Sequence, residues 1–218
     1  MTTLDISRTG HPSRSDRGLA WVLAGGLGVW FLVVLVAGGR GVFVTPPSRP
    51  PLPVLVAILV PLALFATAYR WSPRFRAFAL GLDLRTLTAV QAWRVLGAIF
   101  LALYAFDLLP GLFAWPAGVG DAAVGVGAVL SLRAMLHDTP NWRRGVWWLN
   151  VGGLLDFVGA IGTGVLTSTT GFGFVASDAP RASLGALPLS LVPTFAVPLW
   201  IMFHAISLLQ LRHLDERP

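Results

Sequence analysis

The strongest constraint on this 218-residue chain is a series of six apolar runs, each about as long as a helix that crosses a lipid bilayer. A bilayer core of about 30 Å needs roughly 20 helical residues. Hydrocarbon offers no partner for backbone N–H and C=O groups, so an apolar run of this length in lipid must be helical. The predicted spans cover residues 19–39, 52–69, 87–108, 111–132, 146–166 and 187–211.

Composition agrees with a membrane assignment. The chain is 55% hydrophobic and 12% charged, whereas an ordinary soluble domain is about 25% charged. The apolar runs leave no stretch long enough for a separate water-soluble core. We therefore expect an all-α membrane protein with a single six-helix transmembrane domain at 19–211 and short tails at 1–18 and 212–218.

The distribution of arginine predicts the orientation of the bundle. All sixteen basic residues are arginines; the six-span model places twelve at one membrane face and three at the other, with Arg94 inside a span. Cytoplasmic loops carry the excess of basic residues, so both termini should be cytoplasmic. The net charge of +6 also suits nucleic acid, but basic loops between apolar runs favour anionic headgroups instead. We expect the lipid bilayer as partner, no nucleic acid, and the inner membrane of a bacterium, which the exclusive use of arginine favours.

The segment between the second and third runs predicts a short interfacial helix over about 72–85. Ser72 suits a helix N-cap, and Pro73 suits the first helical position. Aromatic and aliphatic side chains recur there at helical spacing against arginines, as in helices that lie on a membrane surface. The alternative is a plain basic loop.

The polar residues inside the spans are the candidate functional residues. A charged side chain at mid-membrane costs at least about 2.5–3.5 kcal/mol, so each one needs a partner or a neutral form. Counted inward from the cytoplasmic ends at 1.5 Å per residue, Arg94, Asn150 and His204 lie roughly 6–10 Å deep and the two aspartates about 15 Å deep, near the midplane. An arginine side chain is long enough to bridge these two layers. We predict one buried polar cluster, composed of Arg94, Asp121, Asp156, His204, Gln91 and Asn150.

Small residues accompany both carboxylates. On the fourth and fifth spans they share helix faces that should admit a neighbouring backbone closely, namely Gly118, Asp121 and Gly125, and Gly152, Asp156 and Gly159. Because Arg94 can neutralise only one carboxylate fully, the second should share a proton with its neighbour. His204 is a candidate relay for that proton. The alternative is that the buried pairs only fix helix packing.

Two further groups of residues are secondary candidates. Pro193 and Pro198 interrupt the sixth span, and the carbonyls that they free near Thr194 would suit a cation or solute; the alternative is a kink needed for packing. Tyr104 and Asp107, near the outer end of the third span, mark either an entrance or a pair of interfacial anchors.

Several activities are excluded by residue content. The chain has no cysteine and no lysine, which removes thiolate metal sites, disulfides, Schiff bases and a Walker A lysine. Only His204 lies well inside a span, so a bis-histidine haem is not expected. We predict no metal, no cofactor and no catalytic residues.

The last 130 residues or so contain a distinctive pattern: LPGLFAWPAGVGD at 109–121, the segment around Asp156, and VPTFAVP followed by His204. This pattern resembles a group of bacterial polytopic membrane proteins of uncharacterised function, with about six helices and an LPxxFAxPAGxGD segment. The resemblance implies a membrane location and no activity.

The leading functional hypothesis is a small transporter or channel-like protein that handles a small solute or a proton. In it Asp121 and Asp156 carry protons, and Arg94 acts as counter-ion or anion clamp. The alternative is a structural or accessory subunit that binds a membrane partner or forms a homo-oligomer. An intramembrane or lipid-modifying enzyme is the third, because acid and base groups are present without a recognisable nucleophile or metal set.

Overall fold

The computed structural model describes residues 14–45, 51–167 and 184–215. Within these ranges the chain forms helices and no strands. Six helical segments are long and apolar enough to cross a membrane, as predicted. The expected N-terminal tail lies largely outside the described residues, as does the end of the C-terminal tail.

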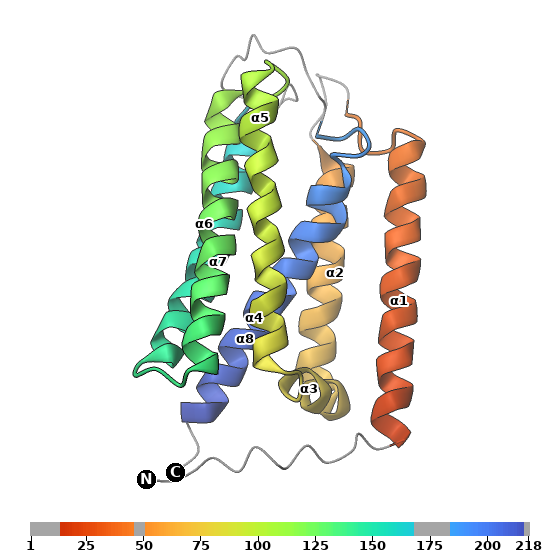
Figure 1. Ribbon diagram of the computed structural model, residues 1–218. Coiled ribbons are helices and arrows are strands. Elements are labelled where there is room, and N and C mark those ends of the chain that lie inside the picture. Colours follow the sequence, from red (N-terminus) through yellow and green to blue (C-terminus); the bar gives the residue numbers. More distant parts are fainter. Residues whose placement is uncertain (1–13, 46–50, 168–183, 216–218) are drawn as a thin grey trace.

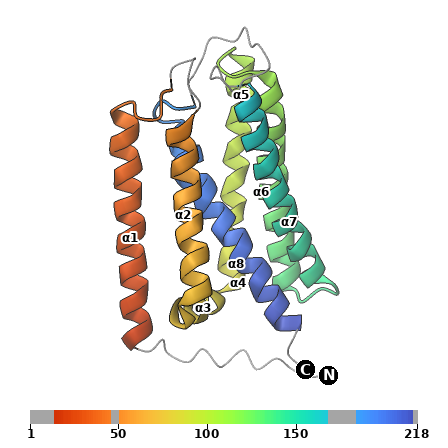
Figure 2. The ribbon, with the colours of Figure 1, turned by 180° about the vertical axis from the view of Figure 1, so that it is seen from behind.

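The first two long helices form one side of the molecule. α1 spans Arg14–Gly39 and α2 spans Leu52–Trp71. Figures 1 and 2 show α1 standing at the edge of the bundle in both views. Its contacts with the rest include the aromatic rings of Trp30 and Phe31 against Phe195. Most of the surface of α1 therefore faces outward, and its apolar side chains suit lipid.

The short helix α3 spans Pro73–Leu80 and turns the chain from α2 into the third long segment. Ser72 caps it as predicted, with its hydroxyl accepting a hydrogen bond from the Phe75 N–H at 3.2 Å. The helix ends earlier than the predicted 85, because Asp83 caps a new helix by accepting from the backbone of Arg85 and Thr86. Gln210 holds the turn by donating to the carbonyls of Ala79, Leu80 and Leu82.

The third long segment is not a regular α-helix throughout. α4 covers Leu84–Gln91, a 3₁₀ stretch η1 covers Ala92–Ala98, and α5 covers Ile99–Ala105. The predicted span at 87–108 was thus shifted by about one turn. The tighter 3₁₀ winding lies where this segment meets α6 and carries Arg94.

The other three long segments complete the bundle. α6 spans Gly111–Leu136, α7 spans Trp142–Leu166, and α8 spans Val197–Asp215 after a π-helical turn η2 at Val192–Ala196. The sixth predicted span began too early, since residues 184–190 form turns and a bend before η2. Pro188 and Pro193 have no N–H to donate to a preceding turn, which explains the late and irregular start.

Packing is densest among the third to sixth long segments. α6 packs along η1 and α7, while α8 crosses from α2 at one end to α7 at the other, as Figures 1 and 2 show. Two predicted small-residue contacts are confirmed: a Cβ on Gly118 would lie 2.7 Å from Leu101 Cγ, and one on Gly125 would lie 2.5 Å from the Val95 nitrogen. The corresponding prediction for Gly152 and Gly159 was wrong, because both face open space.

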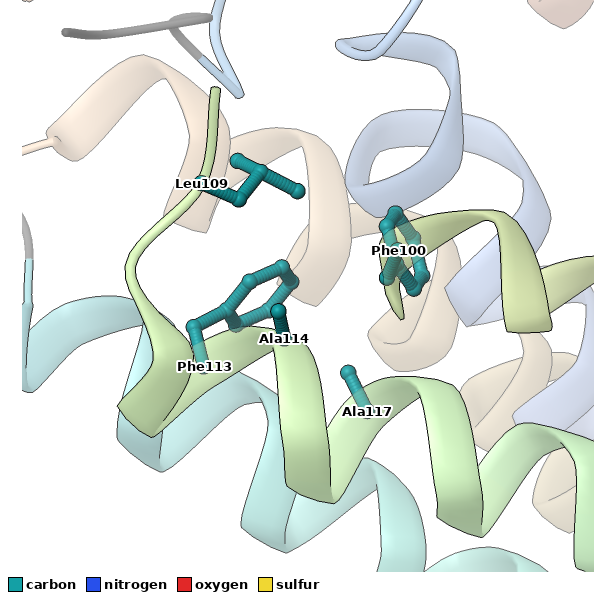
Figure 3. Packing of buried hydrophobic residues seen from close by; sticks show 5 residues of the cluster. All are labelled: Phe100, Leu109, Phe113, Ala114 and Ala117. Atoms are coloured by element: carbon teal, nitrogen blue, oxygen red, sulfur yellow. The ribbon is translucent and has the colours of Figure 1, made fainter. Parts of the chain in front are cut away.

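A compact apolar cluster closes one end of the bundle. Figure 3 shows Phe100 of α5 beside Phe113 of α6, with Leu109, Ala114 and Ala117 around them. The two phenyl rings meet edge to face with centroids 5.4 Å apart, a favoured aromatic geometry. This cluster forms part of the wall of the cavity described below.

Candidate functional site

Arg94 is the centre of the predicted polar cluster. It lies on η1 and is only 4% exposed. Its Nε donates to Asp121 Oδ1 of α6 at 2.7 Å, and its Nη2 donates to Asp156 Oδ2 of α7. One guanidinium therefore joins both carboxylates, which confirms that the three side chains converge. Such charge-assisted bonds are the strongest hydrogen bonds in proteins.

The remaining side of the guanidinium is also occupied. Nη1 donates to the Gly153 carbonyl at 3.3 Å and lies 3.1 Å from His204 Nε2. The guanidinium carbon lies 3.9 Å from the centroid of the Phe157 ring, a cation–π distance. Arg94 is thus held by groups from α6, α7 and α8.

The hydrogen bonds define the tautomer of His204. Arginine can only donate, so His204 Nε2 must accept from Arg94. His204 Nδ1 lies 2.8 Å from Asn150 Oδ1, while the Asn150 amide nitrogen donates to the Val146 carbonyl. The amide oxygen therefore accepts from Nδ1–H, and the ring is neutral in this arrangement. Both ring nitrogens are engaged, so His204 can relay a proton only if Arg94 moves.

Three glycines make room for the cluster. A Cβ on Gly97 would overlap the Asp121 carboxylate, one on Gly120 would overlap that of Asp156, and one on Gly153 would overlap the His204 ring. Sequence reasoning missed these positions, along with Phe157. The sequence also offered Gly120 beside Asp121 and Gly153 beside Gly152, but the predicted helix faces contained Gly118 and Gly152 instead.

The structure separates the other candidates from the cluster. Gln91 is fully buried, and neither its amide nitrogen nor its oxygen has a hydrogen-bond partner among the described residues. The Thr194 hydroxyl donates to the Ser190 carbonyl at 2.6 Å, so it occupies a carbonyl of its own helix. Pro193 lines the cavity described next, and Pro198 is buried.

Tyr104 and Asp107 lie at the end of the third segment and away from Arg94. The Tyr104 ring packs against Trp115 with centroids 6.2 Å apart. Asp107 follows α5 with a φ of 54°, a left-handed conformation in which aspartate is more common than most residues. Neither residue lines the cavity.

A cavity of about 620 Å³ reaches the cluster. At one end it is bounded by residues at helix termini, including Phe43, Pro51 and Leu109, and at the other by Arg94, Asp121 and Asp156. Most of the described wall is aliphatic or aromatic. Its volume falls within the range of about 300–1,000 Å³ that is usual for small-molecule sites.

The carboxylates, rather than the guanidinium, present accessible surface. The side chains of Asp121 and Asp156 are 17% and 11% exposed, against 3% for Arg94. With both carboxylates ionised and His204 neutral, the cluster carries one excess negative charge. In the part of the chain that is described, no three His, Asp or Glu side chains are grouped as a metal site requires.

Comparison with protein families gives one match. A family described as a domain of unknown function, DUF8737, matches residues 51–212. The chain belongs to this family. No curated protein and no solved structure matches the chain. The DUF8737 region begins at α2 and includes every residue of the Arg94 cluster, whereas α1 lies outside it.

Proposed function

We propose that this protein is a small transporter or channel-like protein in which Asp121 and Asp156 carry a proton. The observation that supports this function is the cavity, which ends on two carboxylates that share one arginine. Ionisable groups inside membrane spans are costly, and they commonly mark proton or solute pathways. A protonated carboxyl in this pair would make the cluster neutral, and release of that proton would restore the negative charge.

Arg94 and His204 act as positioning residues in this proposal. The guanidinium holds both carboxylates in place, and His204 together with the Gly153 carbonyl holds the guanidinium. Because four of the five N–H donors of Arg94 are engaged, it serves as a counter-ion and not as a clamp for an anion. Proton exchange then takes place on the cavity side, where the carboxylates are accessible.

The proposed setting is the inner membrane of a bacterium with both termini in the cytoplasm. The excess of arginine in the segments at one end of the bundle supports this orientation, and the resemblance to bacterial polytopic proteins supports the source. In this orientation α3 lies at the cytoplasmic surface, with Arg74 and Arg76 near the headgroups. The end of the cavity that is bounded by Phe43, Pro51 and Leu109 then lies on the periplasmic side.

Proton flux in proteoliposomes tests the function. A pH-sensitive dye is trapped inside, the membrane potential is clamped, and an imposed pH gradient decays through the protein. We expect Asp121→Asn and Asp156→Asn each to slow the decay by at least about tenfold, since each removes an ionisable carrier. Asp138→Asn, an exposed aspartate with a φ of 46°, is the matched control and should keep the original rate.

A second candidate function is a structural subunit whose cluster only fixes helix packing. The observation that favours it is that groups of the protein itself engage four of the five N–H donors of Arg94. Under this alternative the two asparagine variants would lose stability while proton flux stays at the level of empty liposomes in every sample. That result, with folded protein, would overturn the transport proposal.

A further inference from the structure

We infer that the cavity binds an amphipathic organic cation, with an apolar body in the cavity and an ammonium group at Asp121 and Asp156. The inference rests on the proposed function, since it names the solute that would exchange with the proton. Three properties of the site support it: the sign of the accessible charge, the apolar wall, and the direction from which the cavity can be entered.

The sign of the charge favours a cation. Among the described residues that line the cavity, the charged ones are Arg94, Asp121 and Asp156. Groups of the protein engage four of the five N–H donors of Arg94, and its side chain is nearly unexposed, whereas both carboxylates have accessible surface. An ammonium group at this end would balance the excess negative charge, and an anion would meet the carboxylates first. An ammonium and a carboxylate also form charge-assisted hydrogen bonds.

The wall favours an apolar body on the same molecule. It includes the aromatic side chains of Phe100, Phe113 and Trp200 together with aliphatic residues of α2 and η2. Such a wall stabilises apolar surface at about 25 cal/mol per Å² removed from water. The buried indole N–H of Trp200 has no hydrogen-bond partner among the described residues.

The position of the cavity favours entry from the bilayer. It is bounded by Val54 and Ile58 of α2 and by Trp93, Leu96 and Ile99 of η1 and α5. The last three are more than half exposed. α2 packs mainly on η2, α3 and α8. A molecule dissolved in lipid could thus reach the carboxylates laterally.

Binding should depend on pH through competition. A proton and an ammonium would neutralise the same excess charge on Asp121 and Asp156, so acidification should weaken cation binding. The other groups that face this pair are Arg94 on η1 and, behind it, His204 on α8. Exchange of one cation for one proton conserves charge, and it requires no other reactant.

Equilibrium binding to the full chain in nanodiscs tests the inference, with empty nanodiscs as the blank. The probes share one apolar body: 4-phenylbutylamine, 4-phenylbutanol and 5-phenylpentanoate. Isothermal titration at neutral pH should give an affinity for the amine at least about tenfold above that of the alcohol, which corresponds to roughly 1.4 kcal/mol. The carboxylate probe should bind more weakly than either. Equal affinity of amine and alcohol, or tightest binding of the carboxylate, would overturn the inference.

Variants distinguish the contribution of the carboxylate charge to binding from the contribution of the cavity volume. Asp156→Asn should abolish the preference for the amine over the alcohol, because the cluster becomes neutral. Ala160→Leu narrows the cavity without altering any charge and should weaken both probes, whereas Ala102→Leu, on an exposed face outside the cavity, should leave both unchanged. Amine binding without proton flux would support this inference and overturn the transport proposal. Proton flux without amine binding would support the transport proposal and overturn this inference.

Discussion

In a soluble protein the most apolar helices are the most buried, but the α1–α2 side and the α4–α8 side of this molecule show the reverse. α1 and α2 are the most apolar of the long helices, yet they are the least buried: 6% of the apolar window of each is buried, compared with 33% for the sixth segment. Moving apolar surface from lipid into a contact between helices releases little free energy. Polar groups and close packing therefore decide which helices associate in a membrane. The Arg94 cluster therefore belongs to the four segments that are less apolar.

The family match follows the same division in part. The DUF8737 region includes the four segments that surround Arg94 together with α2, and it leaves α1 outside. α2 has a role that α1 lacks, since Pro51, Val54 and Ile58 form one wall of the cavity. The peripheral side is thus not uniform: α2 shapes the cavity, while α1 mainly contacts η2.

The largest expected effect comes from removing the central charge. Arg94→Gln leaves two carboxylates near the middle of the bundle without their cation, and breaking a buried pair in this way costs about 3–5 kcal/mol. Reversible unfolding in mixed micelles should show this loss of unfolding free energy. Arg40→Gln, at the exposed end of α1, is the matched control and should change stability by less than about 0.5 kcal/mol. Equal stability of the two variants would contradict a cluster that holds the bundle together.

A smaller effect is expected from adding one methyl group beside the cluster. A Cβ on Gly153 would overlap the His204 ring, which is itself fixed by Arg94 and Asn150. Gly153→Ala should therefore lower the unfolding free energy by about 1–3 kcal/mol, the usual cost of overpacking. The measurement is the same unfolding titration in mixed micelles.

Two glycines in open space are the controls for this variant. Gly152, the preceding residue on α7, and Gly25, on α1, have nothing within 4 Å of an added Cβ. Alanine there should be neutral or should stabilise by up to about 1 kcal/mol, because it reduces the freedom of the unfolded chain. A loss at Gly152 as large as that at Gly153 would mean that the α7 backbone, and not the cluster, is sensitive.

The glycines also show where sequence reasoning reached its limit. Six apolar runs and the cost of buried charge were enough to predict the six long helices and the approach of Arg94 to both aspartates. The sequence does not say which glycine of α7 faces the neighbouring helices, because small residues precede and follow Asp156 and several sets of them share a helix face. Whether Gly152 or Gly153 makes the close contact depends on the position of α8, and the residue spacing within α7 gives no information about that position.

Irregular winding was the other feature beyond the reach of the sequence. The run at 87–108 has the composition of an ordinary helix, and nothing in it distinguishes the 3₁₀ stretch of η1, which depends on packing against α6. The cavity was not predicted either. It lies between the η1–α5 segment and α2, which packs mainly on η2, α3 and α8, and the relative placement of two helices cannot be inferred from their separate apolar faces.

The smallest expected effect lies at the junction between the two sides, where α3 leads into α4. Asp83 caps α4 at the edge of the membrane segment. Burial acts to raise the pKa of Asp83, but hydrogen bonds from the Thr86 hydroxyl and from the backbone of Arg85 and Thr86, with the Arg85 charge, outweigh it and lower the pKa. Asp83→Ala removes the cap and should cost about 0.5–2 kcal/mol at neutral pH.

The pH dependence of the same cap gives a sharper measurement. A carboxyl with a lowered pKa in the folded state stabilises the fold above its unfolded pKa, and this contribution is lost as the pH falls through the folded pKa. The advantage of the original chain over Asp83→Asn should therefore be present at pH 6 and decline below about pH 4. Asparagine still caps the helix but does not titrate, so the difference between the two chains cancels protonation elsewhere, including at Asp121 and Asp156. A difference that stays constant down to pH 3 would show that the ionised form of Asp83 adds nothing to the stability of the junction beyond what a neutral cap provides.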